Sequence, residues 1–166
     1  IGATHTGKIL AVFELLGVLA SIGIIFSGIM AIAQKEIVRS FCYILISEIG
    51  YIVLAISAWN RYGFEGAILH IINDMFMMAC LFSVWSLVHS KTGNSTVDEW
   101  NGLNRFFPHI MGVFVLCALS VIGVPPFCGF FSKWYILLGL ISAKKWLYSV
   151  VIVASALLNT VYFFKI

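Results

Sequence analysis

The chain has 166 residues, of which 61% are hydrophobic and 10% are charged, and its mean hydropathy is +1.04. Soluble domains are about half apolar and about a quarter charged, and one of this size leaves roughly 30% of its chain surface exposed to water. These values exclude a water-soluble fold and predict an integral membrane protein in a lipid bilayer. The net charge of +3 comes from scattered residues, which argues against nucleic acid as a partner.

Five segments are long and apolar enough to cross a hydrocarbon core of about 30 Å, which takes about 20 helical residues. They lie near residues 9–33, 37–59, 66–89, 109–142 and 146–164. Short links join them, apart from a substantial loop over residues 90–107. Because the chain begins at Ile1 rather than at a methionine, we expect it to be part of a longer or a split polypeptide.

The fourth segment is too long for one crossing. As a single helix its 34 residues would reach about 50 Å, at about 1.5 Å per residue. Pro125 and Pro126 should interrupt it near the middle of the bilayer, because proline removes a backbone donor and clashes with the preceding turn. Discontinuous helices recur in ion-coupled transporters. A proline kink without a transport role is the alternative.

Four ionisable residues, Glu48, His70, Asp74 and Lys133, lie inside the apolar segments. Such residues are expensive in a membrane and are candidates for a functional site by default. Glu14 is a fifth, but it lies near an end of its segment, where a carboxylate can reach the headgroups.

His70 and Asp74 are four residues apart, so they share one helix face, with Met78 next along it. Histidine titrates near neutral pH, and burial moves the pKa of lysine and of carboxylates. Lys133, Glu48, His70 and Asp74 therefore form a plausible proton relay. A static ion pair between Asp74 and Lys133 is the alternative.

The sequence gives little support for a metal site, disulfide bonds or an enzyme active site. His70 and Asp74 resemble half of a metal site, but no further ligand lies at a suitable spacing along the chain, so we expect no metal. The four cysteines lie in apolar runs without C-x-x-C spacing, which indicates packing rather than disulfides. No phosphate loop, catalytic triad order or cofactor motif is present, so we expect no cofactor and no soluble enzyme chemistry.

Three stretches carry a family resemblance: AQKEIVRSFCYILISEIGYIVLA, GAILHIINDMFMMACLF and LSVIGVPPFCGFFSKWYIL. In these stretches the chain resembles the proton-conducting antiporter family. That family includes the Mrp-type sodium/proton antiporter subunits and the antiporter-like membrane subunits of respiratory complex I. The chain looks most like the D-type subunit of the Mrp antiporters, and the resemblance covers essentially all of it.

The resemblance implies an all-α integral membrane fold. Five transmembrane helices would form one inverted-repeat unit, with the fourth helix broken at Pro125–Pro126. Residues 1–166 would be the second such repeat of a longer subunit, and Lys133 the ionisable residue of its broken helix.

The implied function is translocation of protons, or exchange of sodium ions for protons, within a multi-subunit complex. Other membrane subunits would be its partners, in a prokaryotic cell membrane or an organelle inner membrane. In a respiratory complex it would be a proton-pumping NADH:quinone oxidoreductase-type subunit without a redox site of its own.

The chain also departs from the family pattern. Where members commonly read His-x-x-x-His-x-x-x-Lys, it has His70, Asp74 and Met78, and Glu48 replaces a glutamine. We expect Asp74 to take over the bridging role of the missing lysine. The alternative is a non-conducting structural subunit that keeps the fold but has lost part of the relay. A small-molecule carrier is less favoured, since no polar cluster has the shape of a substrate site.

Overall fold

The computed structural model describes residues 2–93 and 95–166, and this part of the chain is helical with no β-strand. The all-α prediction is therefore confirmed. The helices are α1 (Gly2–Ala33), α2 (Ile37–Ser57), α3 (Arg61–Thr92), α4 (Val97–Trp100), the 3₁₀ turn η1 (Leu103–Arg105), α5 (Pro108–Ile122), α6 (Cys128–Ser142) and α7 (Trp146–Lys165).

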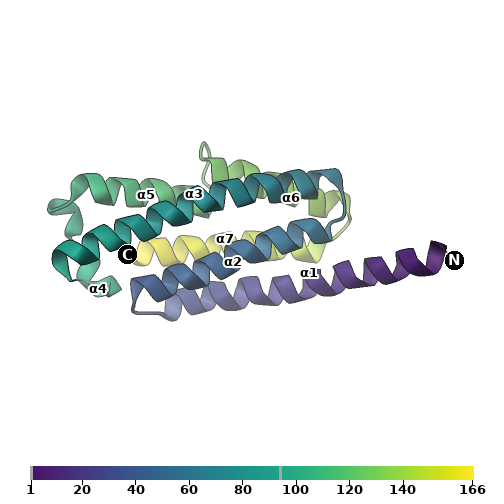
Figure 1. The fold of residues 1–166 in the computed structure, drawn as a ribbon, viewed down its shortest axis with the longest axis horizontal. Coiled ribbons are helices and arrows are strands. Elements are labelled where there is room, and N and C mark those ends of the chain that lie inside the picture. The colour runs from purple at the N-terminus through teal and green to yellow at the C-terminus, as the bar shows by residue number, and fades with distance from the viewer. Residues whose placement is uncertain (1, 94) are drawn as a thin grey trace.

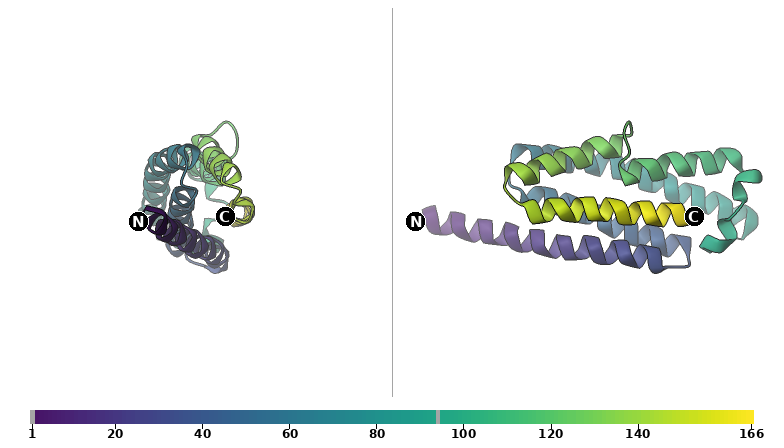
Figure 2. Two further views of the ribbon diagram at one scale, coloured as in Figure 1. Left: turned by 90° about the vertical axis from the view of Figure 1, so that its right-hand side faces the viewer. Right: turned by 180° about the vertical axis from the view of Figure 1, so that it is seen from behind.

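The long helices form an elongated bundle with their axes roughly along one direction (Figure 1). Helix α1 packs on α2 and α7, while α3 packs on α2 and runs along both α5 and α6. Figure 2 shows from behind how α7 lies between α1 and the α5–α6 pair. In the described part of the chain, four helices are long and apolar enough to cross a membrane, or five if the bent pair Val97–Arg105 and Pro108–Ile122 is one span.

The fourth segment is interrupted where the sequence predicts. Helix α5 ends at Ile122 and is capped by Gly123, whose φ of 90° is in the left-handed region that favours glycine. Pro125 and Pro126, joined by a cis peptide bond, lie in the loop that follows, and α6 begins at Cys128. This loop projects from the side of the bundle between the two half-helices (Figure 1).

Caps explain why α3 is longer than the expected 66–89. The Asn60 side chain accepts a hydrogen bond of 2.8 Å from the Gly63 amide at its start, and Gly93 ends it with a φ of 75°. The long loop that follows also contains two short elements, α4 and η1. A capping box formed by Thr96 and Glu99 begins the first of these.

The buried apolar residues form two clusters. One lies around Phe41, Leu81 and Phe114, and the other around Tyr51, Leu54 and Ile136. Both draw on α2, α3 and α7, each using a different stretch of these helices. Outside the clusters, α1 exposes a stripe of large apolar side chains that includes Leu15, Leu19, Ile22 and Phe26. Such a surface suits lipid or a neighbouring membrane helix.

Small residues allow α3 and α6 to lie close together. A Cβ atom on Gly139 would lie 2.7 Å from the Gly63 amide nitrogen, and one on Gly66 would lie 2.7 Å from the Ile136 amide nitrogen. Close approach at glycines is typical of packed membrane helices. This contact matters for the site, because α3 and α6 carry most of its residues.

We predict that Gly139→Leu destabilises the fold, because a side chain there meets backbone that cannot move aside. Overpacking of this kind costs about 1–3 kcal/mol or more. The measurement is thermal unfolding of the complete subunit in detergent. Gly112→Leu is the matched control, since nothing lies within 4 Å of a Cβ at Gly112. Equal melting temperatures for the two variants would contradict the packing described here.

Candidate functional site

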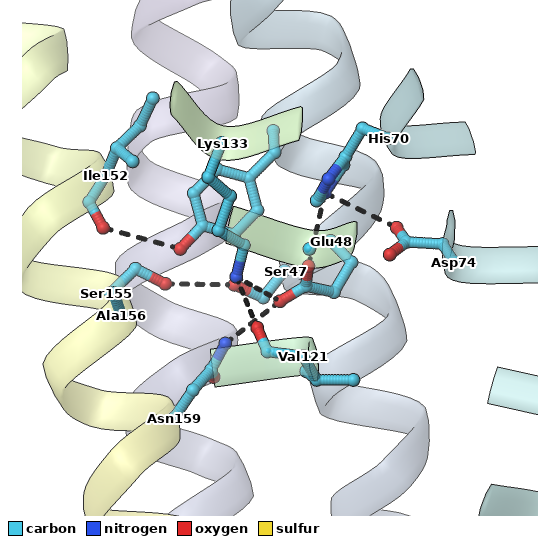
Figure 3. A network of polar contacts seen from close by, with 12 residues as sticks. Ser47, Glu48, His70, Asp74, Val121, Lys133, Ile152, Ser155, Ala156 and Asn159 are labelled. Atoms are coloured by element: carbon cyan, nitrogen blue, oxygen red, sulfur yellow. Dashed lines mark hydrogen bonds and ion pairs between the residues drawn. The ribbon is translucent and has the colours of Figure 1, made fainter. Parts of the chain in front are cut away.

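A set of buried polar side chains lies between the two apolar clusters, and we call it the polar layer. Its members come from five helices: Glu48 on α2, His70, Asn73 and Asp74 on α3, Ser120 on α5, Ser132 and Lys133 on α6, and Asn159 on α7. All are at most 7% exposed. Figure 3 shows the centre of this layer, where the side chains of Lys133, Glu48, His70 and Asp74 follow one another.

The break between α5 and α6 provides a partner for Lys133. Its ammonium group donates to the Val121 carbonyl at 2.5 Å and to Glu48 Oε1 at 3.3 Å, and it lies 4.6 Å from the centroid of the Tyr51 ring. Val121 is in the last turn of α5, where carbonyl groups lack an amide partner within the helix. A cation at a helix C-terminus is also favoured by the helix dipole.

Glu48 connects the lysine with the histidine. Its Oε1 atom accepts hydrogen bonds from Lys133 and, at 2.9 Å, from the Asn159 amide. Its Oε2 atom lies 3.1 Å from His70 Nε2. The carboxylate partner of Lys133 is thus Glu48, and not Asp74 as in the static pair considered from the sequence.

His70 is held by its other ring nitrogen. Ser132 donates its hydroxyl hydrogen to the Gly129 carbonyl at 3.0 Å and lies 3.0 Å from His70 Nδ1. A hydroxyl group whose hydrogen is used in this way meets the ring as an acceptor, so Nδ1 carries the ring proton. The Nε2 atom then faces Glu48 Oε2 and Asp74 Oδ2, the latter at 3.4 Å.

Asp74 ends this row of ionisable groups. Its Oδ1 atom accepts from the Asn73 amide at 3.5 Å, and Asn73 in turn accepts from the Ser120 hydroxyl at 3.1 Å. One turn further along α3, Met78 is buried in the apolar cluster around Phe41. On α3, the row of ionisable groups in the polar layer therefore ends at Asp74.

The remaining candidates lie apart from the polar layer. Glu14 binds Lys145 at 2.6 Å and Tyr148 at 2.9 Å. Pro125 and Pro126 are exposed and influence the site by shaping the helix break. A pocket of about 160 Å³ beside this break reaches Lys133 and has a mostly apolar lining.

The sequence did not identify several residues that hold the site. Asn159 could have been noticed, because it is the one amide side chain in the apolar segment 146–164. Ser132 had a weaker signal, its position next to Lys133. The role of Val121 had none, since it acts through its carbonyl group. Glu48 supplies the third possible ligand beside His70 and Asp74, which spacing along the chain could not reveal because it comes from another helix.

Several known proteins share this fold. In solved structures, a chain of the Mrp complex from Dietzia sp. DQ12-45-1b superposes with a TM-score of 0.89 at 22% identity, covering 92% of this chain and 29% of that one. A chain of respiratory complex I from Thermus thermophilus gives a TM-score of 0.86 at 21% identity, covering 92% of this chain and 32% of that one.

Curated relatives are similar over nearly the whole chain. The N subunit of the NADH-quinone oxidoreductase of Desulforudis audaxviator is 40% identical over 96% of this chain, which corresponds to 32% of that protein. The D-type protein of the Na(+)/H(+) antiporter of Alkalihalophilus pseudofirmus is 28% identical over 99% of this chain and 32% of its own length. The chain thus spans about a third of these relatives, and its identity to the oxidoreductase protein exceeds that to the antiporter protein.

The model of the family described as "NADH:quinone oxidoreductase/Mrp antiporter, TM" matches residues 6–159. This match includes every residue of the polar layer, and it confirms the resemblance and the membrane location expected from the sequence. The chain belongs to the NADH:quinone oxidoreductase/Mrp antiporter transmembrane family.

Proposed function

We propose that this chain is the second five-helix repeat of an antiporter-like subunit, and that its polar layer moves protons within the membrane. The observation that carries this proposal is the unbroken row Lys133–Glu48–His70–Asp74. Successive groups in this row are 3.3, 3.1 and 3.4 Å apart. These separations are about those at which protons pass directly or through one water molecule.

The geometry supports a specific order of transfer. Lys133 can give a proton to Glu48 and is recharged from the pocket beside the helix break. Glu48 and Asp74 both face His70 Nε2, so the ring can take a proton from one carboxyl group and give it to the other at the same atom. The Nδ1 proton stays hydrogen-bonded to Ser132 throughout, and no ring rotation is needed.

The partners of this chain are inferred from its relatives. The relatives named above are subunits of NADH-quinone oxidoreductase and of a sodium/proton antiporter, and this chain spans about a third of each. We therefore infer that it works inside a multi-subunit complex of a prokaryotic or organelle inner membrane. Its ions are protons, with sodium ions as the exchanged partner if the complex is of the antiporter type.

Met78 favours a second candidate, a structural subunit that does not conduct. Because this residue is apolar and buried, a proton that reaches Asp74 must leave α3 there. If it has no acceptor on a neighbouring subunit, the polar layer only holds the helices together. Proton flux distinguishes the two candidates.

Lys133→Ala should abolish proton translocation by the complete complex in reconstituted vesicles, because the row loses the group at the helix break. Assembly should remain nearly intact, since the Glu48 carboxylate keeps its hydrogen bond to Asn159. Lys35→Ala is the control, as it removes an exposed lysine outside the layer. Normal flux in the Lys133 variant of an assembled complex would rule out the relay.

Asp74→Asn should reduce proton flux at least tenfold, because the amide keeps the shape of the side chain but cannot accept and release a proton. The measurement is the initial rate of a pH-sensitive dye in the same vesicles. Glu65→Gln is the matched control on α3, since Glu65 pairs with Arg61 at one end of that helix. Unchanged flux in Asp74→Asn would favour the structural subunit.

A further inference from the structure

Three buried polar atoms of the layer point toward one another without a hydrogen-bond partner. They are Glu48 Oε2, His70 Nε2 and Asp74 Oδ2, and none has such a partner among the described residues. One ligand atom from each of these three residues lies within 4.8 Å of the other two. The side chains of Glu48 and His70 are fully buried, and that of Asp74 is 9% exposed.

These atoms are all acceptors in the arrangement described above. Since the ring proton of neutral His70 is on Nδ1, its Nε2 presents a lone pair to two carboxylate oxygens. The layer also carries an uneven formal charge, because Glu48 and Asp74 contribute two negative charges and Lys133 one positive. Buried lone pairs that face each other are costly unless a proton or a metal ion lies between them.

We propose that Glu48, His70 and Asp74 bind a divalent metal ion with mixed nitrogen and oxygen preference, of the class represented by Zn²⁺. One imidazole and two carboxylates suit such an ion, with a fourth position left for water. Ligand atoms at about 2.0–2.2 Å in a tetrahedral site are about 3.3–3.6 Å apart. The distances from His70 Nε2 to the two oxygens, 3.1 and 3.4 Å, are close to this range.

In each of the three ligand side chains, the polar atom that would not bind the metal already has a contact within the protein. His70 Nδ1 donates to Ser132, Asp74 Oδ1 accepts from Asn73, and Glu48 Oε1 accepts from Asn159. Metal sites use such outer contacts to fix the orientation of their ligands. A chance approach of three side chains would not supply one for each of them.

The positive charge of Lys133 opposes a metal ion here. Its ammonium group lies on the Oε1 side of Glu48, away from the Oε2 atom that faces His70, and the Val121 carbonyl holds it there. The metal site does not rest on the proposed function, because binding requires only the three ligands and their geometry.

The test is zinc binding by the purified complete complex, first stripped with a chelator and then dialysed against Zn²⁺ alone. We expect the native complex to bind one more Zn²⁺ per copy of this chain than complexes carrying His70→Ala or Asp74→Asn. His109→Ala is the matched control, since His109 is exposed and outside the layer. Zinc-edge X-ray absorption of the native complex should show one imidazole and oxygen ligands.

Two further variants keep the test decisive. Ser132→Ala leaves all three ligands in place and should weaken zinc binding about 10–100-fold, the usual effect of losing an outer contact. Lys133→Ala should retain zinc binding, while the zinc-free complex that carries it should lose proton flux, which separates this proposal from the relay. Equal zinc binding by the native complex and the His70, Asp74 and Ser132 variants would overturn the site. A proton shared by the three side chains would then account for their approach.

Discussion

A charged lysine in an apolar segment must find partners inside the protein, and this requirement organises the structure. Lys133 meets it with two groups from other parts of the chain, the Val121 carbonyl and the Glu48 carboxylate. The carbonyl is available only because α5 stops at Ile122, so the helix break and the buried ammonium group depend on each other. The carboxylate fixes the rotation of α2, which must turn Glu48 toward α6.

The polar layer keeps its place because apolar residues seal it on both sides. Along α2, Glu48 lies between Ile44 of one cluster and Tyr51 of the other. Along α7, Asn159 likewise lies between Ile152 and Tyr162. Buried polar side chains in such a layer depend on partners within the protein, because an unpaired polar atom is costly in a low-dielectric interior.

The sequence predicts what depends on single segments and misses what depends on how helices face each other. Hydropathy and Pro125–Pro126 gave the spans and the break, and charge inside apolar segments gave the four ionisable residues. The pairing of Lys133 with Glu48 rather than Asp74 depends on helix rotation and on the close α3–α6 contact at glycines. The same holds for Asn159, whose partner is 111 residues away in sequence.

Proton transfer and metal binding would each relieve the repulsion between acceptor atoms at His70. Its Nε2 atom and two carboxylate oxygens repel one another unless something positive lies between them. A proton can fill this role while it passes from Glu48 through His70 to Asp74. It is bound to one side chain at a time, so each side chain can release it to the next. A divalent ion would be held by all three at once and would stay. The contacts of Ser132, Asn73 and Asn159 orient the three groups for either occupant, so protons can pass along this row only while no metal ion is bound there.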